Sequence, residues 1–145
     1  MEKAMKLSII ARIGIIALTW SRFLQKQLLP HDITVKQIYL LKQLIKTDFL
    51  YPADIADLLF CDRPTASVII RNLEKKGWLE KKADPDDGKR FQVSITLAGA
   101  KMVHQVLESG YKGDKTFDPE SVLTPDEAEL LENLLIKIQK AVKTL

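Results

Sequence analysis

The hydrophobic pattern of the 145-residue chain changes its period at Gly77, and this change narrows the folds that are open to it. Before Gly77, apolar residues recur at the i, i+3, i+4, i+7 spacing of amphipathic helices. After it, residues 78–81 and 90–96 alternate as strands, and the turn-forming residues 84–88 lie between them. A group of helices that leads directly into one β-hairpin predicts a mainly α protein with a small hairpin, in the α+β class.

Start and stop signals divide the region before the hairpin into three helices. Thr34 and Gln37 form a capping box ahead of the first. Pro52 suits the first turn of the second, and Asp62 is a good N-cap for the third, which ends near Gly77. The side chains expected to face the core are Ile38, Leu41, Leu44, Ile45, Ile55, Leu58, Leu59, Ala66, Ile69, Ile70 and Leu73. Two helices joined by a tight turn and followed by a hairpin form the winged helix-turn-helix pattern of DNA-binding proteins.

The two ends of the chain carry more apolar surface than one small core needs. Residues 9–28 are apolar on nearly all sides of a predicted helix that Pro30 ends, and residues 125–142 carry a wide apolar stripe. A second subunit would bury this surface. We therefore expect a single domain, 1–145, with residues 33–101 as a DNA-binding lobe and residues 1–29 and 102–145 as a dimerisation region.

Two further start signals follow the hairpin. Thr96 caps a predicted helix that runs to Leu107, and Thr124 and Glu127 form a second capping box. Between these helices Gly110, Gly113 and Pro119 interrupt the pattern. A loop or kink is expected there.

The charges are distributed unevenly along the chain. The net charge is only +3, but residues 1–46 carry +6 and residues 102–145 carry −3. This polarity suits a molecule that presents one face to an anionic partner, and an accidental arrangement of solvated helix faces is an equal alternative.

Six stretches, in order and at matching spacing, resemble the multiple antibiotic resistance regulator (MarR) family of bacterial transcription factors. They are DIADLL (54–59), DRPTAS (62–67), NLEKKGWLE (72–80), DPDDGKR (84–90), VSIT (93–96) and LTPDE (123–127). The resemblance implies a winged helix-turn-helix regulator of transcription, expected to be a repressor. It would act as a homodimer on a pseudo-palindromic operator in double-stranded DNA, and a small aromatic or anionic effector would release it. A winged helix that contacts proteins instead of DNA is the alternative.

The exposed face of the helix that begins at Asp62 is expected to read DNA. If the apolar stripe of this helix is buried, short polar side chains and one arginine remain outside. Arg71 has the geometry for guanine O6 and N7, Thr65 and Ser67 can reach a base or a phosphate, and Val68 can touch a thymine methyl. The family often has Arg at position 68 and an acidic residue at position 71, so no operator sequence is transferred. A plain solvated helix face is the alternative.

Basic residues around this helix and in the hairpin are expected to contact the DNA backbone and the minor groove. Arg63, Lys75, Lys76, Lys81 and Lys82 are candidates for phosphate contacts. The family's wing-tip arginine aligns with Lys89, and Arg90 follows it, so that either side chain is a candidate for the minor groove. The resemblance also implies that Asp87 pairs with a neighbouring basic side chain.

The candidate effector site consists of aromatic walls with one cationic anchor. Its residues are Arg12, Trp20, Phe23 and Tyr39, with His31 nearby in the sequence. Packing of Trp20 and Phe23 in a subunit interface is the stronger alternative. Cys61 is expected to pack the turn before the DNA-reading helix, and thiol oxidation is the lesser alternative.

Several classes of function are disfavoured. One cysteine and two histidines, Cys61, His31 and His104, are too sparse for a zinc site, and one cysteine forms no internal disulfide. We find no catalytic motif and expect neither an enzyme nor a cofactor. The uncharged stretch 13–21 is too short to cross a membrane, which favours a cytoplasmic protein without a membrane partner.

Overall fold

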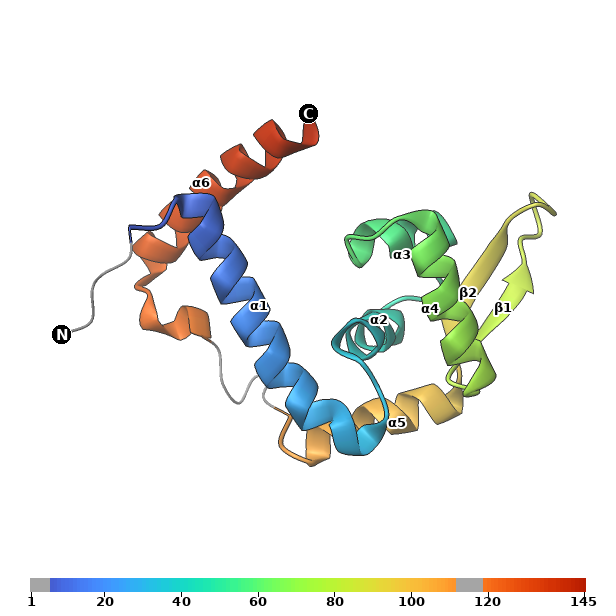
Figure 1. Cartoon of the computed structure of the whole chain (residues 1–145). Helices are drawn as coiled ribbons and strands as arrows, with labels where there is room; N and C mark the ends of the chain where they lie inside the picture. The colour runs from blue at the N-terminus through green and yellow to red at the C-terminus, as the bar shows by residue number, and fades with distance from the viewer. Residues whose placement is uncertain (1–5, 112–118) are drawn as a thin grey trace. The chain divides into compact units, whose positions relative to one another are not determined.

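The computed structural model describes residues 6–111 and 119–145. The described residues up to Tyr111 form one compact unit, and the residues from 119 onward belong to a second. The first unit contains the helices α1 (Ile9–Leu28), η1 (Leu29–His31), α2 (Val35–Ile45), α3 (Pro52–Leu58), α4 (Arg63–Lys75) and α5 (Leu97–Glu108), and the strands β1 (Leu79–Ala83) and β2 (Phe91–Ile95) (Figure 1). The second contains η2 (Pro119–Val122) and α6 (Pro125–Lys143). The predicted mainly α winged helix-turn-helix architecture is confirmed.

Local capping explains where the helices begin. The hydroxyl of Thr34 accepts the backbone N–H of Gln37 at 3.1 Å, and the Gln37 side chain accepts the N–H of Thr34 at 3.0 Å. Asp62 caps α4 by accepting the N–H of Thr65 at 2.7 Å. Thr96 and Thr124 cap α5 and α6 in the same way, and the second capping box at Thr124 is complete. The start signals predicted from the sequence are therefore confirmed, because each depends only on residues within one turn.

The hairpin is fastened to the helical lobe along its length. β1 and β2 pair antiparallel in a register that sets Leu79 opposite Ile95 and Ala83 opposite Phe91. Leu50, in the segment between α2 and α3, exchanges two backbone hydrogen bonds with Val93, at 2.9 and 2.8 Å. This bridge adds a third short segment beside the middle of β2 and fixes the hairpin to the segment that leads into α3.

α5 begins in close contact with the turn that joins α4 to β1. Thr96 donates its hydroxyl to the carbonyl of Gly77 at 2.6 Å, and its backbone N–H to the carbonyl of Trp78 at 3.1 Å. Gly99 lies so near that a Cβ built on it would be 2.1 Å from the Trp78 carbonyl oxygen. A glycine is therefore required at this approach.

The core of the first unit surrounds α2. Ile38, Leu40, Leu41 and Leu44 are buried there against residues of α1, α3, α4, β2 and α5. Ile45 was expected to face the core, but 45% of it is exposed. It is the last residue of α2 and points about 100° away from the buried Leu44, so that prediction was wrong.

Much of the exposed apolar surface lies on the terminal helices α1 and α6. Within α1 only Leu24 and Leu28 are buried, and α6 has no buried residue. The large apolar side chains left exposed on these two helices are Ile9, Ile10, Ile15, Ile16, Leu18, Phe23, Leu130, Leu131, Leu134, Leu135, Ile136 and Val142. None of the described helices is long and apolar enough to cross a membrane.

The interruption predicted after α5 is partly visible. The helix ends at Glu108, and Gly110 has a positive φ of 86°. Gly113 lies outside the described residues.

Candidate nucleic-acid interface

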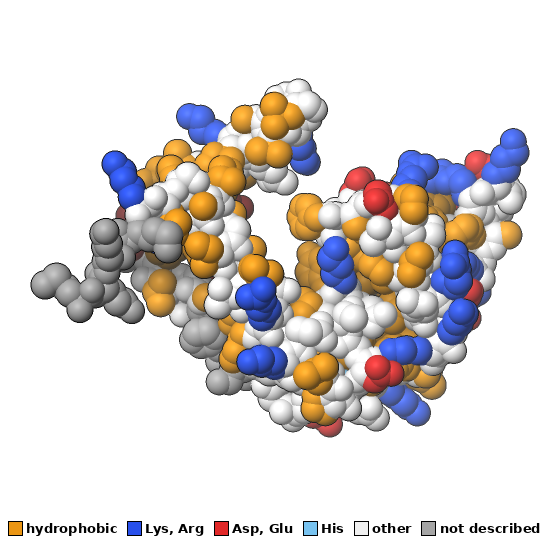
Figure 2. Space-filling view, in the orientation of Figure 1, with side chains coloured by type: hydrophobic (Ala, Val, Ile, Leu, Met, Phe, Trp, Pro, Cys, Tyr) orange, Lys and Arg blue, Asp and Glu red, His pale blue; other side chains and the backbone are white. Residues whose placement is uncertain are grey.

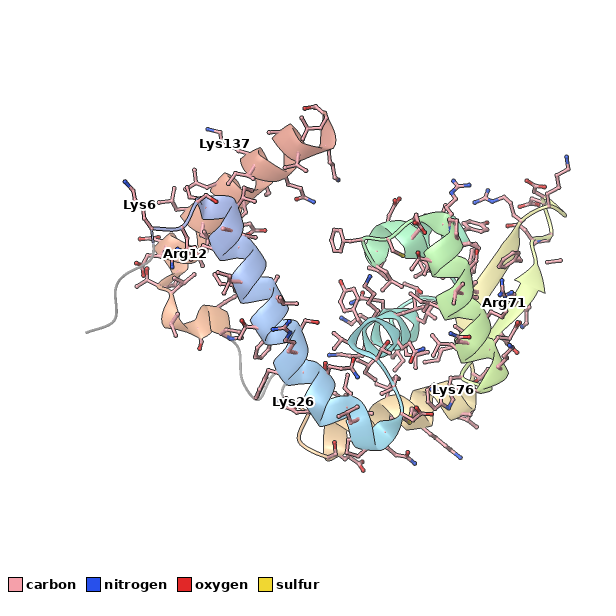
Figure 3. All side chains as sticks on the ribbon, viewed as in Figure 1. Lys6, Arg12, Lys26, Arg71, Lys76 and Lys137 are labelled. Carbon is pink, nitrogen blue, oxygen red and sulfur yellow. The ribbon has the colours of Figure 1, made fainter. Side chains whose placement is uncertain are left out.

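α4 separates a buried stripe from an exposed, mostly polar face. Ala66, Ile70 and Leu73 are buried against the core, and Ile69 is partly buried. On the other side the structure exposes Arg63, Thr65, Ser67, Val68, Arg71 and Lys75. All the predicted DNA-reading residues of this helix thus share one exposed surface, and Figure 3 shows Arg71 on the side of α4 away from α2.

The cap at the start of this face is electrostatically favourable. Asp62 accepts hydrogen bonds from Thr65, chiefly at its side chain and then at its backbone N–H, and this lowers the pKa of the Asp62 carboxyl. The carboxylate also lies at the N-terminus of α4, where the helix dipole favours a negative charge.

The lysines expected to contact phosphates fall into two groups. Lys76 donates to the backbone carbonyl of Asp32, lies 3.4 Å from the Asp32 carboxylate and sits 4.7 Å from the centre of the Trp78 ring. Lys81 lies 3.6 Å from Glu74 and 5.0 Å from the centre of the Phe91 ring. Both ammonium groups are thus held by the chain itself.

Lys75 and Lys82 are freer. Lys82 lies 3.7 Å from Glu80 in a pair whose side chains are 70% and 50% exposed, an arrangement that contributes little in water. In the described part of the chain Lys75 forms no ion pair. Figure 2 shows Lys and Arg side chains gathered over α4 and the hairpin, which is where an anionic partner would be attracted.

The turn of the wing is built around a buried carboxylate. Asp84 is only 6% exposed, and one of its oxygens accepts the Tyr51 hydroxyl at 2.5 Å. The other accepts the backbone N–H groups of Asp86 and Asp87, at 2.8 and 3.2 Å. The bond from Tyr51 is the main reason that the pKa of Asp84 is lowered, and the same bond raises the pKa of Tyr51.

Sequence reasoning missed this function of Tyr51 and Asp84. The resemblance implied that Asp87 pairs with a basic side chain, and this pairing stays a prediction. The Asp87 carboxylate accepts the backbone N–H of Lys89 at 3.0 Å, because the tight turn brings that N–H onto it. The signal for Asp84 was present in the sequence: an aspartate followed by Pro-Asp-Asp-Gly is a typical start of an Asx-type turn.

Lys89 and Arg90 have different surroundings. The guanidinium of Arg90 lies 3.6 Å from the centre of the Tyr51 ring, where the turn of the wing joins β2. Lys89 is exposed in the turn, and its side chain has no partner in the described part of the chain.

The residues predicted for the effector site are spread over the first unit. Trp20 and Phe23 stack on each other with ring centroids 5.4 Å apart, and Trp20 also packs against the core. Arg12 lies eight residues before Trp20 on α1, about 12 Å along the helix axis. Tyr39 lies on α2 and is 42% exposed. His31 lies 3.2 Å from the hydroxyl of Ser109. A site that uses these residues stays a prediction.

The structure does contain a different hollow. A pocket of about 390 Å³ lies among α1, η1, α2 and the C-terminal end of α4. It is lined by Gln25, Leu29, Asp32, Ile33, Thr34, Gln37, Asn72, Lys75 and Lys76. None of the four predicted effector residues lines this pocket.

The structure places Cys61 in the turn before α4. Cys61 is partly buried and packs against the core beside α4, as a small apolar residue would. Residues 6–111 and 119–145 contain no group of three potential metal ligands.

Comparisons of the sequence with known proteins all point to one family. The model of the MarR family matches residues 31–90. The multiple antibiotic resistance protein MarR of Salmonella typhimurium is 30% identical over 117 residues, which are 81% of each chain. The protein of the same name from Escherichia coli K12 is 29% identical over 120 residues, again 81% of each chain.

Solved structures of regulators from two organisms have the same fold. MepR of S. aureus in its DNA-binding conformation matches with a TM-score of 0.81 and 26% identity, over 94% of this chain and 99% of that one. A mutant MarR from E. coli complexed with operator DNA matches with a TM-score of 0.74 and 26% identity, over 88% and 91%. The chain has the winged-helix fold of these regulators, and it is 30% identical to a MarR protein over 81% of each chain. The chain therefore belongs to the MarR family, whose members are transcriptional regulators and not enzymes.

Proposed function

We propose that the chain is a transcriptional repressor that binds a pseudo-palindromic operator as a homodimer. The observation that carries this proposal is the exposed face of α4, where short polar side chains, Val68 and Arg71 stand clear of a buried apolar stripe. Two relatives solved with DNA, a mutant MarR of E. coli with operator DNA and MepR of S. aureus, support DNA as the partner, and a helix face of this kind suits the major groove.

The contacts of α4 divide into those that read bases and those that hold the backbone. Arg71 forms a bidentate pair with guanine, and Val68 contacts a thymine methyl. Thr65 and Ser67, in the first turns, reach a base edge or a phosphate. Arg63, Lys75 and Lys82 contact phosphates, and Lys89 approaches the minor groove.

The dimer is formed by the exposed apolar faces of α1 and α6. Ile16 is 61% exposed and Leu130 is 61% exposed, values that are unfavourable for an isolated chain in water. A two-fold dimer would bury both faces and would set two copies of α4 about 34 to 36 Å apart, one turn of DNA.

Two substitutions of Ile16, one disruptive and one conservative, test the dimer. Because Ile16 is exposed, Ile16→Glu leaves the winged lobe folded, and we expect a monomer in sedimentation velocity together with loss of operator binding. Ile16→Leu is the control and is expected to stay dimeric. A wild-type chain that is monomeric at micromolar concentration would contradict the proposal.

An effector that releases DNA is the third part of the proposal. Trp20 and Phe23 supply an aromatic wall on α1, Arg12 supplies a cation and Tyr39 supplies a hydroxyl, a set that suits a small aromatic carboxylate. Titrating such an acid into the protein–operator complex is expected to lower affinity, and Arg12→Ala is expected to abolish that response without changing DNA binding alone.

Base reading is tested by fluorescence anisotropy on the DNA beside the chain's own gene. Arg71→Ala is expected to cost about 1 to 3 kcal/mol on the operator and to relax preference at one base pair of each half-site. Lys82→Ala is expected to weaken operator and random duplexes equally, and Lys140→Ala on α6, which removes the same charge, is the control. Equal losses on operator and random DNA for Arg71→Ala would contradict the assignment. Wild-type binding that does not depend on salt would indicate a protein partner instead of DNA.

A further inference from the structure

Tyr51 lies at the meeting point of three separate parts of the DNA-binding lobe. It precedes the first residue of α3, and its backbone N–H donates to Asp54 at 3.1 Å. Its neighbour Leu50 is bridged to Val93 in β2 by two hydrogen bonds. The segment that carries Tyr51 is thus anchored both to α3 and to the wing. The ring of Phe49 also packs edge-on against the ring of Tyr51, with the two ring centres 5.4 Å apart.

The hydroxyl of Tyr51 controls the shape of the wing turn through Asp84. At 2.5 Å the bond from Tyr51 orients one carboxylate oxygen, which leaves the other in place to accept the N–H groups of Asp86 and Asp87. A carboxylate that is only 6% exposed needs such partners to remain charged. Removing the hydroxyl therefore loosens the two amide hydrogen bonds that fold the turn.

The ring of Tyr51 controls a second part of the wing. The Arg90 guanidinium lies 3.6 Å from the ring centre, within the range of a cation–π contact. The backbone of Arg90 closes the same turn, since its carbonyl accepts the N–H of Asp84 at 3.1 Å and its N–H donates to the carbonyl of Asp87 at 3.0 Å. Arg90 is therefore held where the turn joins β2, while Lys89, one residue earlier, is exposed in the turn.

We propose that Tyr51 is the positioning residue of the wing. It holds the turn through its hydroxyl and Arg90 through its ring, so that Lys89, and not Arg90, is the side chain that enters the minor groove. This inference rests on the proposed DNA-binding function. It also assigns a specificity, because an ammonium is more strongly hydrated than a guanidinium and gains less from the narrow groove of an A·T tract.

The positioning part is tested first on the free protein, by NMR. In Tyr51→Phe the amides of Asp86 and Asp87 are expected to exchange with solvent several times faster than in the wild type, while Tyr39→Phe, which removes an exposed hydroxyl, leaves them unchanged. The side-chain protons of Arg90 are expected to be shifted upfield by the Tyr51 ring. That shift should persist in Tyr51→Phe and disappear in Tyr51→Leu. Unchanged amide exchange in Tyr51→Phe, or an Arg90 signal at its ordinary position in the wild type, would overturn the positioning assignment.

The functional part is tested by a double-mutant cycle on operator DNA. Lys89→Ala is expected to weaken binding about five- to tenfold, and Tyr51→Phe about two- to fivefold, the ordinary range for one lost contact. If Tyr51 acts by placing Lys89, then Tyr51→Phe has no further effect in the Lys89→Ala background. Fully additive losses would overturn the link between the two residues.

Two single substitutions test which cation enters the groove. Lys89→Arg is expected to increase affinity several-fold for operators whose flanks are A·T tracts, and to change affinity little where the flanks are G·C-rich. In Arg90→Lys, whose charge is kept, the preference between these flanks is expected to stay as in the wild type. If Arg90→Lys loses the preference between A·T and G·C flanks and Lys89→Ala keeps it, the groove contact belongs to Arg90 and the proposal is overturned. If the wild type binds no duplex in a salt-dependent way, the proposed function fails, and the NMR results still decide the positioning of the wing.

Discussion

Replacing Gly99 by alanine tests whether α5 and the wing form one packed unit. The new Cβ would lie 2.1 Å from the carbonyl oxygen of Trp78, 2.8 Å from Cγ1 of Ile95 and 3.0 Å from the carbonyl carbon of Trp78. Ordinary van der Waals contact begins near 3.4 Å, so α5 and the Trp78 backbone must separate by about 1.3 Å. Two hydrogen bonds from Thr96, to the carbonyls of Gly77 and Trp78, resist that movement. The clash is with backbone, which cannot rotate away as a side chain can.

Overpacking of this kind costs about 1 to 3 kcal/mol, and the rigid partner places Gly99→Ala at the upper end. At about 3 °C per kcal/mol for a chain of this length, Tm should fall by about 9 °C. Thermal unfolding is followed by circular dichroism at one protein concentration, because the Tm of a dimer depends on concentration. Gly88→Ala is the control, since nothing lies within 4 Å of its built Cβ and its φ is not positive. A Gly99→Ala protein that melts together with the Gly88→Ala control would refute the reasoning.

Three other predictions concern titration and the contact between two helices. Asp62 has a lowered folded pKa, so its contribution to stability is present above the ordinary value of 3.8 and is lost as pH falls below it; Asp62→Asn should flatten the acid side of the unfolding profile. Burial raises the pKa of Tyr111 to about 12, so the stability that the neutral phenol contributes is present below pH 10 and is lost as the pH rises through 12. Absorbance at alkaline pH should show this late ionisation, and Tyr111→Phe should remove it. Lys76→Met should release the link to Asp32 and lower Tm by a few degrees, while Lys75→Met should weaken DNA binding and leave Tm unchanged.

The elements predicted most successfully from the sequence are those whose signals are local. Helix starts at Thr34, Asp62 and Thr96 depend on one side chain and one backbone N–H a turn away, so they are visible in a printed sequence. Ile45 shows where that logic fails. An apolar residue at the end of a helix matches the periodic pattern, but whether it is buried depends on a neighbour that the pattern does not contain.

The contacts of the wing required the structure because their partners are far apart in the chain. Tyr51 and Asp84 are separated by 33 positions, and Lys76 and Asp32 by 44. Nothing in the local sequence distinguishes Lys75 from Lys76, yet in the described part of the chain Lys75 forms no ion pair and Lys76 binds Asp32. Composition counts both as cations, and only three-dimensional placement separates a residue that is free to contact phosphate from one that is already occupied.

This distinction predicts the salt dependence of DNA binding. Lys76, Lys81 and Arg90 are held by partners within the chain. The cations that remain to neutralise DNA charge are Arg63, Lys75 and Lys82 at phosphates and Lys89 in the minor groove. At about −0.9 per DNA phosphate neutralised, these four in each subunit of a dimer give a slope of log K against log salt near −7, whereas adding the three occupied cations would give about −13. Anisotropy titrations between low and moderate salt separate these values readily. A slope near −13 would show that DNA pulls the held cations from their partners, and Lys76→Met would then lower the slope as much as Lys75→Met does.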